Sequence, residues 1–236
     1  MGLGADLQSN VHQFLKSSWT RTEGRVVPEP EAIGMGNDGV ELKAAVCLYA
    51  DLADSTGLVN TFSDWFAAVV YKSFLHCAVK IILSEGGTIT SFDGDRVMGL
   101  FVGTDRFNAA ARAGLKINWA TSQMVEPAIK ANWKDQSSVQ ALQIRHTVGI
   151  DASKVFAART GARGNNDIVW VGRAPNYAAK LATWRDPRVP TLITADVFAG
   201  LSGLARDTNG TCMWGKDSRT INGVVVYSSN YYMPMT

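Results

Sequence analysis

The stretch ITSFDGDRVMGLF, residues 89–101, places an Asp-Gly pair between two runs of β-prone residues. Such a pair predicts a β-hairpin, because Asp93-Gly94 can supply the positive φ angles of a two-residue turn. Asp95 is then expected to begin the second strand of the hairpin. The fold is therefore expected to rest on a sheet that carries an acidic side chain at one edge.

A second stretch, AAVCLYADLADST at residues 44–56, ends an apolar run with an aspartate. A turn cluster at 37–39 precedes apolar residues at every second position from 40 to 48, which predicts a strand buried on one face. This strand runs into Asp51. If it lies beside the hairpin, Asp51 and Asp95 reach the same edge of the sheet and can share divalent metal ions, which is typical of a nucleotide site.

Small residues follow Asp51, and they include Ser55 and Thr56. Their backbone amides can approach an anion before a helix begins, so we expect phosphates to bind there. The alternative is that Asp51 and Asp54 are helix caps or turn residues and that Asp95 is an ordinary hairpin residue. Each aspartate taken singly fits this alternative, whereas their joint occurrence favours a metal site.

The composition predicts one large domain with an N-terminal extension. The chain has 236 residues, of which 46% are hydrophobic, enough to bury one substantial core. We expect residues 1–39 to form a helix and linker and residues 40–236 to form the functional domain. No run approaches about 18 uncharged apolar residues and no signal peptide is recognisable, so we expect a soluble, cytoplasmic protein that uses no membrane. Three cysteines are too few for a disulfide framework or zinc site and are expected to be buried thiols.

Charge is unevenly distributed along the chain. The net charge of +2 argues against a general nucleic-acid binder. Residues 141–190 contain eight basic and three acidic residues, which gives this segment +5 and leaves −3 for the remainder. This asymmetry suggests that one surface holds cations and another holds anions around a shared ligand, although a solvated basic face explains it equally.

The order of expected elements predicts an α+β fold. A helix over about 62–81 follows the first strand, and the hairpin, a helix over 108–132 and a strand near 142–148 come next. This is the ferredoxin-like βαββαβ plan, in which helices cover one face of a mainly antiparallel sheet. Short strands at 155–158 and 167–171 are expected to follow.

The C-terminal additions begin with a helix that opens at Gly172-Arg173-Ala174-Pro175. Asn176 and Lys180 are four residues apart on this helix, so both project from one face. A further helix at 195–201 and a hairpin turn at Asn222-Gly223 complete the expected chain.

Four motifs, in this order, resemble the catalytic domain of class III nucleotidyl cyclases over about residues 43–230. They are YADLADST, GDRVMGLF, HTVGIDASKVFAARTG and WVGRAPNYAAKL. The resemblance implies that Asp51 and Asp95, together with Leu52, bind two magnesium or manganese ions. It also implies that these ions assist attack of the ribose 3′-hydroxyl on the α-phosphate, with loss of pyrophosphate.

The same resemblance assigns roles to the helix that opens at Gly172-Arg173-Ala174-Pro175. Asn176 falls at the position of the ribose-orienting asparagine, and Lys180 at that of a transition-state arginine. Lysine lacks the planar fork that grips two phosphate oxygens, so Arg173 is a candidate for compensating it and Lys216 for contacting the outer phosphates. In this family the metal aspartates and the Asn/Arg helix come from different subunits, which implies a head-to-tail homodimer with composite sites.

Base-reading positions depart from those of purine cyclases. Ser91 stands where the family usually has lysine or glutamate, and Val169 or Trp170 stands at the partner position. An indole shrinks a purine-sized pocket, and a hydroxyl can bond a carbonyl or an amine. These changes resemble the pyrimidine cyclases of Pycsar antiphage systems, which implies that a pyrimidine nucleoside triphosphate is the substrate. UTP is preferred over CTP, and the product cUMP would be read by a separate effector that binds cyclic nucleotides.

Other interpretations remain open at the level of sequence. Ser91 and Trp170 can also be ordinary strand residues that face the core. A cytidylate or purine cyclase, and a catalytically silent NTP-binding sensor, fit the same motifs. Diguanylate cyclases and polymerase palms share paired carboxylates on such a sheet, but the chain lacks the Gly-Gly-Asp/Glu-Glu-Phe hairpin of the former.

Overall fold

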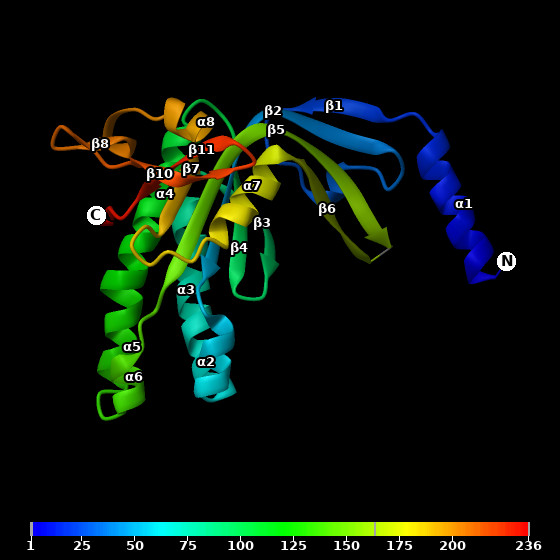
Figure 1. Cartoon of the computed structure of the whole chain (residues 1–236). Helices are drawn as coiled ribbons and strands as arrows, with labels where there is room; N and C mark the ends of the chain where they lie inside the picture. The colour runs from blue at the N-terminus through cyan, green and yellow to red at the C-terminus, as the bar shows by residue number, and fades with distance from the viewer. Residues whose placement is uncertain (1, 163, 236) are drawn as a thin grey trace.

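A computed structural model describes residues 2–162 and 164–235 of the chain (Figure 1). Its helices are α1 (Leu3–Lys16), α2 (Ser55–Thr61), α3 (Asp64–Ser84), α4 (Arg106–Ala120), α5 (Glu126–Asn132), α6 (Ser137–Ala141), α7 (Arg173–Ala182) and α8 (Ala195–Ala199), with 3₁₀ turns at Pro30–Ala32 and Gly203–Ala205 and a π-helical turn at Thr121–Val125. Its strands are β1 (Thr20–Gly24), β2 (Asp38–Leu52), β3 (Thr88–Asp93), β4 (Arg96–Phe101), β5 (His146–Ala162), β6 (Asn165–Gly172), β7 (Thr191–Thr194), β8 (Asp207–Thr208), β9 (Thr211–Cys212), β10 (Gly215–Ile221) and β11 (Val224–Ser229).

One mainly antiparallel sheet organises the described residues. Its strands run in the order β10-β11-β7-β5-β2-β4-β3, while β1 pairs with β2 and β6 pairs with β5. Among the described strands, only β1–β2 and β5–β7 are parallel pairs. The central order β5-β2-β4-β3, with α3 and α4 as the crossovers, is the ferredoxin-like arrangement of the βαββαβ plan. The predicted fold class is therefore confirmed.

Helices cover both faces of the central strands. Val46, Leu48 and Ala50 of β2 pack with α3 and α4 in the main core, whereas Ala45 and Cys47 pack with residues of α7. Figure 1 shows α7 in front of the sheet and α3 and α4 behind it. The prediction that this strand is buried on one face was therefore wrong, because α7 adds a second layer.

Close packing of α7 on β5 depends on Gly149. A Cβ at this position would lie 2.3 Å from the Ala178 carbonyl oxygen and 2.6 Å from the Ala182 nitrogen. Only a residue without a side chain permits this approach, so Gly149 sets the position of α7 on the sheet. The helix that carries Asn176 and Lys180 is thereby fixed against the central strands.

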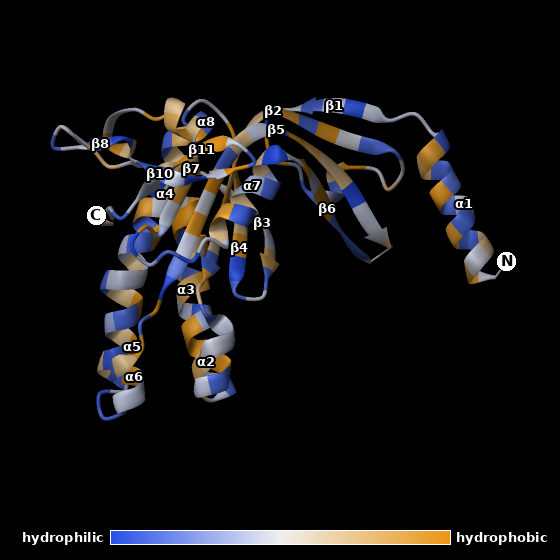
Figure 2. Ribbon diagram, viewed as in Figure 1, coloured by the Kyte–Doolittle hydropathy of each residue, from blue (hydrophilic) through white to orange (hydrophobic). Residues whose placement is uncertain are grey.

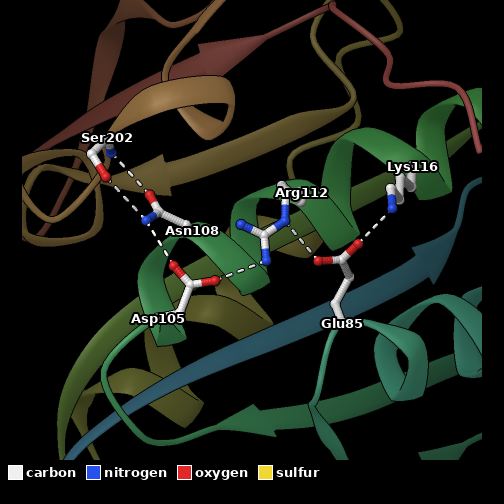
Figure 3. A network of polar contacts seen from close by, with 6 residues as sticks. All are labelled: Glu85, Asp105, Asn108, Arg112, Lys116 and Ser202. Carbon is white, nitrogen blue, oxygen red and sulfur yellow. Dashed lines mark hydrogen bonds and ion pairs between the residues drawn. The ribbon is translucent and has the colours of Figure 1, made fainter.

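A polar network joins the C-terminal end of α3 to α4 (Figure 3). Glu85 accepts hydrogen bonds from Arg112 Nε at 2.7 Å and from Lys116 Nζ at 2.6 Å. Arg112 Nη2 also pairs with Asp105 Oδ2 at 2.9 Å. The Glu85 side chain is only 7% exposed, so its charge is satisfied by two cations rather than by water. These bonds hold the two helices together behind the sheet.

Helix α3 is long and apolar enough by composition to cross a membrane, and it is the only such helix in the described residues. Phe66, Val70 and Phe74 of α3 are nevertheless buried in the main core against the sheet. We therefore interpret α3 as the central core helix.

The N-terminal segment contains the expected helix α1, and it also contributes strand β1 to the sheet. None of the residues of α1 is buried, and its apolar side chains, among them Leu7 and Phe14, are exposed. Figure 2 shows α1 apart from the rest of the domain. Asn37 Nδ2 donates to the carbonyl oxygens of Phe14 and Ser17 and so holds the end of the helix.

The two predicted hairpins have different outcomes. Asn222 and Gly223 both have positive φ, at 48° and 80°, so the turn between β10 and β11 is as predicted. In the first hairpin, Asp93 pairs with Arg96, so the turn residues are Gly94 and Asp95. The placement of the turn at Asp93-Gly94 was therefore wrong by one residue. Gly94 has φ of 61° at the first turn position, which is the geometry in which only the glycine needs a positive φ.

Strand β5 is one continuous strand, whereas the sequence suggested two. It pairs with β2 from His146 to Ala158. Its first part also pairs with β7 and its second part with β6, so the two halves have different neighbours. Leu142 and Ile144 lie before the strand, which corrects its predicted start. The short strand β7 was not predicted at all.

Candidate active site

Asp51 and Asp95 lie at the same end of two neighbouring strands. Asp51 is paired with Arg96 between β2 and β4, and the backbone N–H of Leu52 donates to the carbonyl oxygen of Asp95 at 3.3 Å. One carboxylate oxygen of Asp95 is buried and has no hydrogen-bond partner. The structure thus brings together the two carboxylates that the sequence singled out, and their metal-binding role stays a prediction.

Asp51 is buried at 4% exposure, in surroundings unfavourable to its charge. Burial raises the pKa of this carboxyl to about 6, the guanidinium of Arg185 opposes the rise, and the charge of Asp95 adds to it. A buried carboxylate beside a second acid needs a cation to neutralise it. The electrostatics of this pair therefore favour a bound divalent ion.

Arg185 is the cation that contacts this site in the structure. Its Nη2 lies 3.1 Å from Asp51 Oδ2, and its Nη1 donates to the Leu52 carbonyl oxygen at 3.2 Å. Arg185 lies in the loop between α7 and β7, 134 residues from Asp51 in sequence. In the sequence, Arg185 stands out only as part of a basic segment, because no local pattern indicates its long-range contact.

The oxygen atoms at this site fit a magnesium or manganese ion. Two carboxylates and the carbonyl oxygen of Leu52 are the hard donors that these cations prefer. In residues 2–162 and 164–235, no group of three or more His, Cys, Asp or Glu side chains is placed to hold a metal. Magnesium sites of nucleotide enzymes commonly use one or two carboxylates and complete their coordination with substrate phosphates. The unpartnered oxygen of Asp95 supports this fit.

A cavity of about 460 Å³ adjoins Arg185. Its lining includes Ser55 and Thr56 at the start of α2, and Arg145 and His146 at the start of β5. Arg145 is exposed, whereas His146 is buried, and burial lowers the pKa of its imidazole to about 4. Arg145 and Arg185 offer guanidinium groups that suit phosphates, and Asp54 and Asp186 line the same cavity.

Asp54 also lines this cavity and is the N-cap of α2. It has φ of 58°, and its carboxylate accepts a hydrogen bond from the Gly57 N–H at 3.2 Å. Asp54 therefore fits the helix-cap interpretation, whereas Asp51 lies within strand β2 and does not cap a helix.

Asn176 and Lys180 lie on the exposed side of α7. Within residues 2–162 and 164–235, neither side chain makes a hydrogen bond or ion pair, and so neither contacts Asp51 or Asp95 in this way. The structure therefore does not unite the α7 pair with the carboxylates inside one chain.

Arg173 is engaged in a structural network. Its Nε lies 3.0 Å from Asp151 Oδ2, its Nη2 donates to the Ala152 carbonyl oxygen at 2.7 Å, and it also pairs with Asp196. Asp151 is fully buried and accepts a further bond from Thr194 Oγ1 at 2.5 Å. This network fixes the start of α7 on β5 and β7. Because these contacts occupy the guanidinium of Arg173, they argue against its predicted catalytic role.

The predicted base-reading residues lie around β3. Ser91 lies close to the Tyr49 phenol, whose pKa is raised by burial. Trp170 faces a separate cavity of about 160 Å³ that the 88–90 segment of β3 also lines, and its indole N–H is buried without a partner. Val169 is 44% exposed, so of the two alternatives only Trp170 lines that cavity. The sequence did not indicate that Tyr49 lies beside Ser91, because the alternating pattern predicts only that Tyr49 belongs to a β-strand.

Lys216 lies apart from the carboxylates. It is exposed at the start of β10 and lines a cavity with Asp186, Arg188 and Arg219. This cavity and the one beside Arg185 share Asp186. The structure therefore places Lys216 near the same loop but does not bring it to Asp51.

Comparison with solved structures identifies the class of fold. The guanylyl cyclase Cya2 superposes with a TM-score of 0.67 at 18% identity, and covers 83% of this chain and 95% of its own. The adenylyl cyclase CyaB from P. aeruginosa gives a TM-score of 0.64 at 19% identity, with 80% of this chain and 95% of its own covered. The fold, with its two acidic strand ends, is that of the class III nucleotide cyclase catalytic domain.

Full-length relatives narrow this class. Uridylate cyclases from Burkholderia cepacia and Xanthomonas perforans are 44% and 41% identical to the chain, and each alignment covers 98% of both sequences. A uridylate cyclase from a Rhodovulum species is 32% identical over the same share. The chain belongs to the uridylate cyclase family of nucleotide cyclases. No protein-family model matches the sequence.

Proposed function

We propose that the protein converts UTP to 3′,5′-cyclic UMP and pyrophosphate. The convergence of Asp51 and Asp95 at adjacent strand ends, next to a cavity that Arg145 and Arg185 line, is the observation that carries this proposal. The names of the relatives from Burkholderia and Xanthomonas supply the uridine base.

In the proposed reaction, Asp51, Asp95 and the carbonyl oxygen of Leu52 would hold two magnesium or manganese ions. These ions, when bound, lower the pKa of the ribose 3′-hydroxyl and offset charge on the phosphates. The 3′-oxygen forms a bond to the α-phosphorus, the bond from the α-phosphorus to the bridging oxygen breaks, and pyrophosphate leaves. The hydroxyl proton passes to solvent. The α2 start with Ser55 and Thr56 lies where the triphosphate would bind.

A second copy of the chain is proposed to complete the site. Asn176 and Lys180 are exposed on α7 and do not contact the carboxylates of their own chain. In a head-to-tail homodimer, Asn176 of one subunit would orient the ribose bound at Asp51 of the other, and Lys180 would stabilise charge on the α-phosphate. The uneven charge of the chain is consistent with such a composite site.

Recognition of the base is proposed to involve Ser91 together with Tyr49. Both carry hydroxyl groups that can donate or accept, and neither carries the charge expected of a purine-reading residue. The cavity beside Trp170 is small, at about 160 Å³. A cyclic pyrimidine nucleotide made in the cytoplasm would serve as a second messenger for a separate effector in antiphage defence.

A competition experiment tests this function. The purified protein is incubated with equimolar UTP, CTP, ATP and GTP and with Mn²⁺, and products are resolved by chromatography against 3′,5′-cyclic standards. We expect cUMP to be the main product and Asp51→Asn to form none. If cCMP is the main product, the base is cytosine and not uracil. A cyclic purine nucleotide as the main product would contradict the assignment of a pyrimidine substrate. Binding of UTP without any cyclic product would favour a silent sensor.

A further inference from the structure

We propose that Arg185 occupies the metal-binding oxygens in the nucleotide-free protein and moves to the triphosphate when the metal and nucleotide bind. This inference rests on the proposed function of the Asp51 and Asp95 site. It adds a role for a residue outside the four motifs that carry the resemblance to nucleotide cyclases.

The contacts of Arg185 coincide with two of the proposed metal ligands. Its two terminal nitrogens reach Asp51 Oδ2 at 3.1 Å and the Leu52 carbonyl oxygen at 3.2 Å. A guanidinium supplies a positive charge and N–H donors, so it satisfies the same oxygen atoms that a divalent ion would bind. Arg185 and a metal ion therefore compete for Asp51 and Leu52.

The surroundings of Arg185 make its release possible. The side chain of Arg185 is 42% exposed, whereas that of Asp51 is 5% exposed. An ion pair with one solvated partner is weak, and a divalent cation attracts the buried carboxylate more strongly than a monovalent one does. The pair can therefore be exchanged without unfolding the strands that carry Asp51 and Leu52.

A destination for the released guanidinium lies next to it. Arg185 lines the cavity of about 460 Å³ that Ser55, Thr56 and Arg145 also line. Arg185 lines this cavity and also contacts Asp51, which is not part of the cavity lining. Rotation of its side chain away from Asp51 would free the metal ligands and let its guanidinium, like that of Arg145, bind the phosphates. Arginine matches phosphate oxygens well because it donates two parallel hydrogen bonds.

The test compares Arg185→Gln with Arg188→Gln. Arg188 lies in the same loop, has an 85% exposed side chain and pairs with Asp186, so its variant controls for loss of one positive charge. Binding of Mn²⁺ alone is followed by electron paramagnetic resonance of the free ion. Binding of a UTP analogue with a methylene between its α- and β-phosphorus atoms is measured by calorimetry at saturating Mn²⁺. Circular dichroism melting of both variants verifies the fold.

We expect Arg185→Gln to bind Mn²⁺ about 3- to 5-fold more tightly than the wild type, because a competing ion pair is removed. The same variant should bind the analogue about 10-fold more weakly, because a charge-assisted phosphate contact is lost. Arg188→Gln should change both affinities by less than about 2-fold, since its charge is solvated. Unchanged Mn²⁺ affinity in Arg185→Gln, or equal shifts in both variants, would overturn the inference.

Asp51→Asn separates failure of this inference from failure of the proposed function. If the wild type binds Mn²⁺ and Asp51→Asn does not, the metal site stands whatever the result for Arg185. If wild type and Asp51→Asn bind Mn²⁺ equally, the proposed metal site itself is wrong, and the role of Arg185 falls with it.

Discussion

Replacement of Asp51 by asparagine is expected to stabilise the metal-free fold while it removes the metal site. Burial raises the pKa of Asp51 from 3.8 to about 6 in the folded protein. A shift of about 2 units corresponds to about 3 kcal/mol of differential stability between the protonated and ionised forms. Asparagine resembles the protonated acid in shape but carries no charge. The variant therefore does not bury an ionised carboxylate at this position.

The sign of the effect follows from proton binding. Between pH 3.8 and about 6 the folded state holds the Asp51 proton more tightly than the unfolded state does. The contribution of Asp51 to stability is therefore fully present below pH 3.8 and is lost as the pH rises through about 6. The wild type and Asp51→Asn should be equally stable near pH 4, and the variant should be more stable by about 3 kcal/mol at pH 7.5.

Urea denaturation at a series of pH values, in the presence of a chelator, measures this difference. Asp54→Asn is the matched control, because Asp54 is an exposed helix cap on the same segment. Addition of Mn²⁺ at about 100 times its dissociation constant should return about 2.7 kcal/mol to the wild type and nothing to Asp51→Asn. A stability difference that does not change with pH, or a wild type that is the more stable protein at pH 7.5, would refute the reasoning.

Three further predictions concern α7 and the metal site. Lys180→Ala should lower kcat by about 100-fold, with UTP affinity retained in a binding titration, because its charge acts on the transition state; a parallel loss of affinity would indicate a ground-state role. A mixture of Asp51→Asn and Lys180→Ala, each at least about 100-fold less active alone, should recover about a quarter of wild-type activity, because half of randomly mixed dimers have one intact composite site; no recovery would argue against sites shared between subunits. Arg173→Ala should lower the free energy of unfolding by about 3 kcal/mol, because it leaves the buried Asp151 unpaired, and an unchanged denaturation midpoint would contradict this.

Local patterns in the sequence were sufficient for the central fold. The alternation before Asp51 and the turn residues Asn222-Gly223 predicted β2 and the last hairpin because strand period and turn chemistry act over a few residues. The first hairpin was displaced by one residue, since Gly94 can begin a turn as well as end one. The pairing of Asp93 with Arg96 sets the register of this hairpin.

Long-range contacts account for what the sequence did not predict. Arg185 reaches Asp51 only because the loop after α7 returns to the end of β2. Arg173 was expected near the phosphates, yet the buried Asp151 on β5 holds its guanidinium. Neither pairing follows a helical or strand period, so both depend on how the C-terminal additions pack on the sheet. Tyr49 is a further case, because its strand pattern alone does not show that it meets Ser91.

The most direct test of the central claim is phosphorus NMR of UTP turnover by the wild-type protein with Mg²⁺, with the reaction quenched by a chelator before spectra are recorded. The account predicts equal amounts of a six-membered cyclic phosphodiester and pyrophosphate, and neither product with Asp51→Asn or Asp95→Asn. Release of UDP and phosphate or of linear UMP, or turnover that survives both substitutions, would contradict it.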